Sequence, residues 1–269
     1  MAEPLPSADR TRRLWVTACS VLGVAGVLVG IGVLGTRVEE SPGGDLAADA
    51  TLLAPAAPAF SIWSVIYLGL AAYTVYQWLP AQASDRRHRG LGWLAGGSLL
   101  LNAAWLFVTQ QGWIWLSLVV ILVLAMVLLR LVRHLEETPS FGLAETLVVD
   151  VTFGLYLGWV IVASGANLAA ALASSGWSPG RWTAMGLVAV VVAAGVAALR
   201  LLSGRLAVAA ALVWGMAWVA VGRLAGEPGD ALVGWTAAAG AVVVLWAALR
   251  TRQVGGVLDD AAGEDTRIG

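Results

Sequence analysis

The sequence contains no lysine, so all 16 of its basic residues are arginine. Charged residues are scarce as well: they make up 12% of the 269 residues, about half the share found in soluble domains. Hydrophobic residues make up 59%. These proportions exclude an ordinary soluble domain and predict an all-α integral membrane protein. The formal net charge of −1 argues against nucleic acid as a partner.

The sequence also lacks the residues from which metal and catalytic sites are built. Its one cysteine, Cys19, lies in an apolar run and cannot form an internal disulfide. Its two histidines, His88 and His134, stand beside arginine in stretches expected to be loops, where neither is a buried axial ligand. No Cys/His cluster, HExxH, phosphate-binding loop or nucleophile elbow is present. We therefore predict no metal, no catalytic residues and no enzymatic activity.

The sequence is rich in apolar runs that are long enough to span a membrane. Eight spanning helices are predicted, over residues 14–35, 59–79, 91–109, 113–132, 141–173, 182–202, 206–224 and 231–249. The fifth is the longest and is expected to tilt or to project from the membrane. Residues 36–58 combine acidic residues with Pro and Gly and predict a solvent-facing loop, and residues 253–269 predict a disordered tail.

The arginines predict the orientation of these helices. If both termini are cytoplasmic, 13 arginines fall in cytoplasmic segments, and three fall outside, namely Arg37, Arg181 and Arg223. The asymmetry holds at every loop of an eight-span topology. We therefore expect a multi-pass protein of the cell (inner) membrane, with its N- and C-termini in the cytoplasm.

One polar and aromatic stripe interrupts the fifth predicted span. At about 100° per residue, four residues at i, i+3, i+7 and i+11 fall on one side of a helix: Tyr156, Trp159, Ala163 and Asn167. Gly154 and Gly158, four apart, favour the close approach of a neighbouring helix. A stripe of this kind that faces inward forms a wall able to stack a flat apolar ligand and to hydrogen-bond to it.

Two other predicted spans carry similar residues. Trp63 and Tyr67 share one face of the second, and Asn102 and Trp105 share one face of the third. Spacing alone leaves two interpretations open, a ligand cavity or plain helix packing with interfacial aromatics. The interfacial interpretation fits the tryptophans at predicted helix ends better, namely Trp113, Trp115, Trp177 and Trp182.

Asp150 is the deepest acidic residue, about 12 Å into the fifth predicted span. A carboxyl group at this depth faces protein or water, because burial in lipid is costly. It is a weak candidate for a proton-coupled or ligand-contacting acid. The favoured interpretation is a structural one, in which Asp150 pairs with a nearby Tyr, Trp or backbone group.

The polar and aromatic residues of the second, third and fifth predicted spans, taken in chain order, resemble those of the tryptophan-rich sensory protein family, also called the translocator protein or TspO/MBR family. The fifth helix of that family carries a Tyr-x-x-Trp-x-x-x-Ala-x-x-x-Asn pattern, which matches Tyr156, Trp159, Ala163 and Asn167. Its second helix starts with prolines and runs to Trp-x-x-x-Tyr, and its third carries Asn-x-x-Trp. Those patterns match Pro55, Pro58, Trp63 and Tyr67, and then Asn102 and Trp105.

The resemblance implies a five-helix bundle over residues 1–175, with residues 36–58 as a lid over a ligand cavity. Residues 176–252 are then an additional three-helix segment, which covers a face of the bundle or extends the cavity. Family members bind porphyrins, haem-like tetrapyrroles and sterols, and a homodimer is left open. The cavity-lining residues that it implies are Trp63, Tyr67, Asn102, Trp105, Tyr156, Trp159, Ala163 and Asn167.

The leading hypothesis is a membrane binding protein, acting in transport or sensing, for a flat hydrophobic ligand such as a porphyrin. No resident cofactor is expected, and a bound porphyrin or haem would be a ligand held by stacking and burial. The alternative is a proton-coupled transporter of a small solute that uses Asp150. Two further hypotheses are an enzyme that degrades bound porphyrin and a scaffold whose tryptophans only anchor it.

Overall fold

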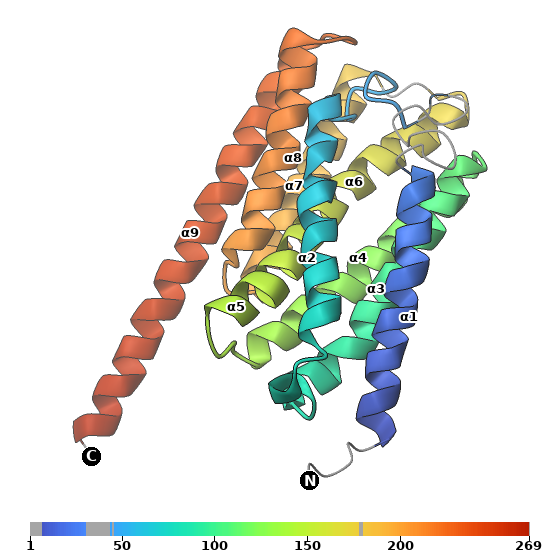
Figure 1. The fold of residues 1–269 in the computed structure, drawn as a ribbon. Coiled ribbons are helices and arrows are strands. Elements are labelled where there is room, and N and C mark those ends of the chain that lie inside the picture. Colours follow the sequence, from blue (N-terminus) through green and yellow to red (C-terminus); the bar gives the residue numbers. More distant parts are fainter. Residues whose placement is uncertain (1–6, 31–43, 45, 178–179, 269) are drawn as a thin grey trace.

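The structure is a computed structural model, and it describes residues 7–30, 44, 46–177 and 180–268. The described residues are helical and contain no strand. In Figure 1, α1 and α2 stand nearly upright and α6 runs obliquely to them, and α9 runs toward the end of the bundle at which α1 begins. Their bounds are α1 Ser7–Gly30, α2 Ile62–Tyr76, α3 Arg86–Gln110, α4 Ile114–Glu137, α6 Thr152–Ser174, α7 Arg181–Leu201, α8 Leu206–Ala225 and α9 Ala231–Ile268.

Four short elements connect or extend these helices. They are η2 (Ala57–Ser61), η3 (Pro80–Gln82), α5 (Leu143–Glu145) and η4 (Thr146–Val151). The last is a π-helical turn that carries α5 directly into α6. The predicted long fifth span is therefore confirmed as one continuous helical stretch, Leu143–Ser174, which is 32 residues long.

Seven helices are long and apolar enough to cross a membrane, by length and composition. They correspond to seven of the eight predicted spans, within a few residues at each end. The predicted first span, 14–35, extends past the described residues, and α1 covers its first part. The backbone of α9 continues as a helix to Ile268, through the stretch for which the sequence predicts a disordered tail.

The placement of the histidines corrects the sequence prediction. His88 lies inside α3 and is fully buried, and His134 lies in the last turn of α4. The reason is the helix cap at Asp85, whose carboxylate accepts hydrogen bonds from the backbone N–H groups of Arg87 and His88. This cap starts α3 at Arg86, five residues before the predicted start.

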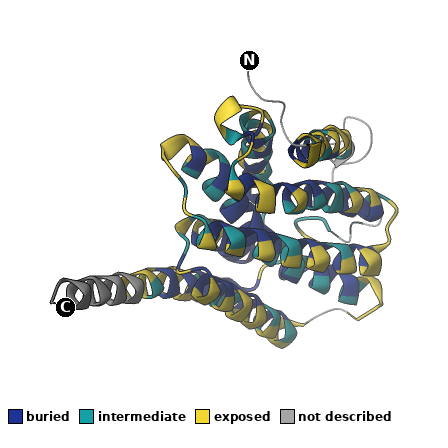
Figure 2. Ribbon diagram, turned by 90° about the horizontal axis from the view of Figure 1, so that it is seen from below, coloured by how far each residue is buried: buried dark blue, intermediate teal, exposed yellow. Residues whose placement is uncertain are grey.

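The outer faces of the helices are exposed and apolar, whereas the buried faces point toward the centre of the bundle (Figure 2). Val65, Leu68, Val119 and Val242 are examples of exposed apolar side chains on three different helices, α2, α4 and α9. An apolar exterior of this extent is typical of a protein that lies in lipid.

Helix α6 is central, with α2, α4, α7 and α8 packed around it. The predicted close approach at Gly154 and Gly158 is confirmed, and the neighbour is α8: a Cβ atom on Gly158 would collide with the backbone oxygen of Val208. Helix α9 packs against α7 and α8. The three C-terminal helices therefore reach the bundle mainly through the glycine face of α6.

Candidate functional site

An aromatic cluster connects α2 with α6. Trp63 stacks on Tyr67, with ring centroids 5.1 Å apart and planes at 14°. Trp63 also meets Tyr156 edge-on at 5.8 Å and Trp159 edge-on at 6.3 Å. Phe60 in η2 meets Trp159 edge-on at 5.8 Å. Contacts of this geometry between aromatic rings are favourable beyond simple burial.

The amide and hydroxyl groups of the predicted site bond to other helices. The Asn102 side chain donates to the Tyr67 hydroxyl at 3.1 Å. The Tyr156 hydroxyl donates to the Ser98 carbonyl at 3.3 Å. These two contacts connect α3 with α2 and α6. In the same way, the Asn167 side chain is paired with Ser117 on α4 at 3.1 Å.

A cavity of about 40 Å³ lies next to this cluster. Two of its walls are indole rings, and both indole N–H groups, of Trp105 and Trp159, are buried and have no hydrogen-bond partner among the described residues. A buried donor without a partner is costly, so such a group calls for an acceptor. The cavity is lined by Leu46, Ala47, Thr51, Ala54, Pro55, Phe60, Trp105, Trp159, Ala163, Ala166 and Asn167.

The connection before α2 covers this cavity, and helix α8 holds it in place. Arg223, buried near the end of α8, donates to the backbone oxygens of Thr51 at 2.9 Å and Ala48 at 3.3 Å. The Trp214 indole donates to the Ala59 oxygen at 2.9 Å, and the Ala56 N–H donates to the Trp218 oxygen at 3.2 Å. We call residues 46–56 the cover segment. It is fixed by the additional helices and does not depend on the five-helix part alone.

The predicted site residues come together in the structure, but they do not all line one space. Four of them line the cavity, namely Trp105, Trp159, Ala163 and Asn167. Trp63 and Tyr156 pack behind it, and Tyr67 and Asn102 line a second hollow of about 120 Å³ between α1, α2 and α3. Trp159 and Asn167 are both 1% exposed, so they face the interior and not lipid.

Sequence reasoning missed Phe60 and the cover-segment residues as parts of the cavity wall. The signal for Phe60 was its position three residues before Trp63, because η2 places both rings against Trp159. The signal for the cover segment was the predicted lid, although no pattern indicated which of its residues turn inward. The exposed Trp113, Trp115, Trp177 and Trp182 lie at helix ends, as the interfacial interpretation predicts.

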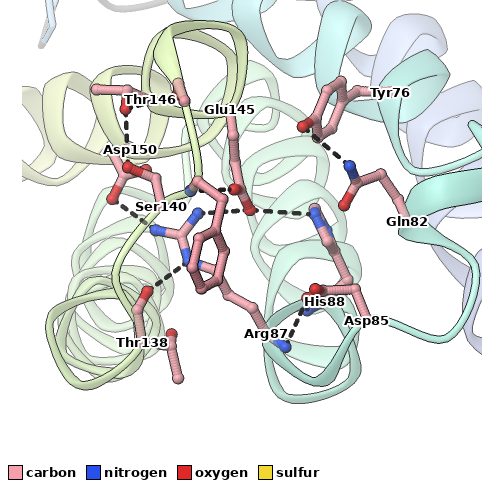
Figure 3. Close-up of polar contacts among 12 residues, drawn as sticks. Tyr76, Gln82, Asp85, Arg87, His88, Thr138, Ser140, Glu145, Thr146 and Asp150 are labelled. Carbon is pink, nitrogen blue, oxygen red and sulfur yellow. Dashed lines mark hydrogen bonds and ion pairs between the residues drawn. The ribbon is translucent and has the colours of Figure 1, made fainter.

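Asp150 belongs to a separate ionic network at the opposite end of α6 (Figure 3). Its Oδ1 atom accepts from Arg87 at 2.7 Å and from Arg205 at 2.7 Å. Arg87 also donates to Glu145 at 2.9 Å, and Arg205 donates to Glu136 at 2.6 Å. The favoured structural interpretation of Asp150 is therefore right in kind, but its partners are arginines and not Tyr, Trp or backbone groups.

The buried His88 lies beside the same network. Its ring stacks on Tyr73 at 6.1 Å, and its Nε2 lies 3.5 Å from Glu145 Oε1. Within the described part of the chain, no three His, Cys, Asp or Glu side chains gather in a way that would hold a metal ion. His88 therefore has an aromatic and acidic environment that the loop prediction did not anticipate.

A family model described as TSPO-like protein matches residues 15–250. The matched range takes in the five helices of the predicted bundle and also α7, α8 and the apolar part of α9. Neither a curated protein nor a solved structure matches the chain.

Proposed function

The chain belongs to the TSPO-like protein family, and from this premise we propose that it binds a flat hydrophobic ligand of the tetrapyrrole class, in transport or sensing. The family generally comprises membrane proteins without enzymatic activity that bind hydrophobic ligands such as porphyrins. The proposed contact residues are the four predicted residues that line the cavity, namely Trp105, Trp159, Ala163 and Asn167, together with Phe60. The other four, Trp63, Tyr67, Asn102 and Tyr156, support this wall from behind through ring contacts and hydrogen bonds.

The observation that carries the proposal is the pair of unpartnered indole N–H groups of Trp105 and Trp159, two residues that line the cavity. Trp105 and Trp159 present two hydrogen-bond donors beside a face of stacked rings. A ligand that satisfies them needs acceptor atoms, such as carboxylate or carbonyl oxygens, on an otherwise flat apolar body. A porphyrin with carboxylate side chains has this chemistry.

The size of the cavity defines how such a ligand would enter. Ligand pockets usually measure roughly 300–1,000 Å³, whereas this cavity holds about 40 Å³. A tetrapyrrole therefore requires the cover segment to move away from Trp159. Because Arg223, Trp214 and Trp218 bond to this segment and its continuation, we propose that α8 controls the opening of the site.

The proposed orientation follows the arginines, with both ends of the chain in the cytoplasm. The network around Arg87 and Asp150 then lies on the cytoplasmic side, and the cover segment lies on the opposite side. Accessibility of single cysteines placed in the cover segment and after Leu201, in intact cells or spheroplasts, tests this arrangement. Labelling of both from the same side would contradict it.

Porphyrin titration tests the binding proposal. Protoporphyrin added to the purified protein should quench tryptophan fluorescence saturably. Trp159→Phe keeps a ring but removes the N–H group, so it should weaken binding about tenfold, as expected for a lost hydrogen bond to a charged acceptor. Trp182→Phe, at an exposed tryptophan outside the cluster, is the matched control and should bind like the parent. Absence of saturable quenching in the parent would contradict the proposal.

The alternative of a proton-coupled transporter has one supporting feature. Asp150 Oδ2 is buried and has no hydrogen-bond partner among the described residues. However, Oδ1 of the same carboxylate is held by the guanidinium groups of Arg87 and Arg205, both at 2.7 Å, as a structural ion-pair partner is. The aromatic cavity is therefore the better supported site.

A further inference from the structure

A polar cavity lies between α3 and α4, apart from the aromatic cavity, the hollow between α1, α2 and α3, and the Asp150 network. It measures about 200 Å³ and is lined by Gly90, Leu94, Arg130, Arg133, His134 and Glu137. Gly90 leaves room for the His134 ring, because a Cβ atom there would collide with the imidazole. His134 Nε2 lies 3.1 Å from the Arg87 carbonyl, which fixes the ring on the inner side of the cavity.

The positive charge in this cavity is poorly compensated. Arg130 makes no hydrogen bond or ion pair with any described residue. Arg133 has one ion-pair partner in the described part of the chain, Glu137, at 3.6 Å, and both of these side chains are more than half exposed. Two guanidinium groups therefore face one carboxylate, which leaves at least one of them available for an added anion.

The cavity continues an exposed apolar stripe on α4. Leu116, Val119, Val123 and Met126 are exposed, and they are spaced by three or four residues, as one helix face requires. The same spacing continues through Arg130, Arg133 and Glu137. This face therefore changes from apolar to basic within about 6 Å, one helical turn after Met126.

We propose that this cavity binds the phosphate of an anionic phospholipid, with its acyl chains against the apolar stripe of α4. Basic pockets between spanning helices are suited to such headgroups, because guanidinium groups form bidentate contacts with phosphate. Leu94 and the stripe favour a lipid over a soluble phosphate compound, because both present apolar surface next to the charges.

Native mass spectrometry of the detergent-solubilised protein tests this proposal, with phosphatidylglycerol and phosphatidylcholine added in equal amounts. The parent should retain one phosphatidylglycerol molecule in preference to phosphatidylcholine. The double variant Arg130→Gln/Arg133→Gln should lose at least about tenfold in phosphatidylglycerol affinity, the loss expected when charge-assisted hydrogen bonds are removed. Both side chains are exposed, and the thermal midpoint should stay close to that of the parent.

The control is Arg200→Gln/Arg250→Gln, which removes the same charge from exposed arginines of α7 and α9. This variant should bind phosphatidylglycerol like the parent, and an equal loss in it would overturn a localised site. Unchanged binding in the Arg130/Arg133 variant would overturn the proposal as well. Inorganic phosphate at millimolar concentration should leave the lipid adduct intact, and displacement by phosphate would assign the cavity to a soluble phosphate compound instead of a lipid.

Discussion

The two ends of α8 are each fixed by one arginine, but the two arginines have different partners. Arg205 is the residue directly before α8, and Arg223 lies in its last turn. Arg205 binds the carboxylates of Asp150 and Glu136. Among the described residues, Arg223 hydrogen-bonds to two neutral backbone oxygens of the cover segment, and it makes no ion pair within 4.0 Å. The charge of Arg205 is therefore compensated by two carboxylates. Arg223 instead holds the cover segment by hydrogen bonds that water can replace more easily.

This difference indicates which end can open. Removing one member of a buried ion pair leaves an uncompensated charge, so the Arg205 end resists rearrangement. Hydrogen bonds to neutral carbonyls contribute less, and the freed carbonyls can accept from water once the segment lifts. The aromatic cavity lies under the cover segment at the Arg223 end, which is held more weakly. A binding site that is closed at rest needs such a weakly held cover so that a ligand can enter.

The largest expected effect comes from breaking the charged end. Arg87 is 4% exposed and binds both Glu145 and Asp150. Arg87→Met should lower the free energy of unfolding by about 3–5 kcal/mol, because two carboxylates lose a buried partner. Thermal unfolding in detergent measures the loss, and protoporphyrin affinity of the folded protein should remain that of the parent. A stability equal to that of the parent would mean that the network contributes nothing.

Asp150→Asn should have a smaller effect on the same end. Arg87 keeps Glu145 and Arg205 keeps Glu136, so the expected destabilisation is about 1–3 kcal/mol, from weakened charge-assisted hydrogen bonds. The variant also tests the transporter alternative. Flux driven by a pH gradient in proteoliposomes should be absent in the parent and in Asp150→Asn. A pH-driven flux in the parent that Asp150→Asn abolishes would favour the transporter and contradict a purely structural role.

At the cover end, Arg223→Met keeps the apolar stem but removes the donors to Thr51 and Ala48. The cover segment should open about tenfold more often, equivalent to about 1.4 kcal/mol. The modification rate of Thr51→Cys in a Cys19→Ala background measures this opening, because position 51 is buried in the closed state. Arg200→Met, at an exposed arginine without a partner among the described residues, is the control. Equal modification rates in all three proteins would remove α8 from the opening mechanism.

The sequence predicts the aromatic face of α6 that lies near the cover segment, but it does not predict the arginine contacts at either end of α8. Hydropathy predicts the spans, and helical spacing predicts the inward face that carries Trp159 and Asn167, because both depend on local periodicity. The pairing of Arg87 with Asp150 joins residues 63 positions apart, and nothing in the local pattern of either helix indicates it. Arg223 was interpreted as a marker of topology, since a sequence does not reveal that a terminal arginine turns inward to a loop 172 positions away.

The smallest expected effect concerns an ion pair near the Arg223 end of α8, which should affect stability without affecting the opening of the cover segment. Arg181 donates to Asp230 Oδ2 at 2.7 Å, and this bond, with those from the Val233 and Leu232 N–H groups, lowers the pKa of the Asp230 carboxyl. Because its pKa is lowered, the Asp230 carboxylate stabilises the folded protein at pH values above the usual pKa of about 3.9, and this contribution is lost as the pH falls through the lowered pKa.

Asp230→Asn should therefore have a slightly lower thermal midpoint than the parent at about pH 5, and the difference should shrink toward about pH 3. Cover-segment labelling should not change in this variant, because the described hydrogen bond between Asp230 and Arg223 joins their backbones. A pH-independent difference would show that the charge of Asp230 contributes nothing to the stability, and faster labelling would show that the cover depends on the α8–α9 connection as a whole.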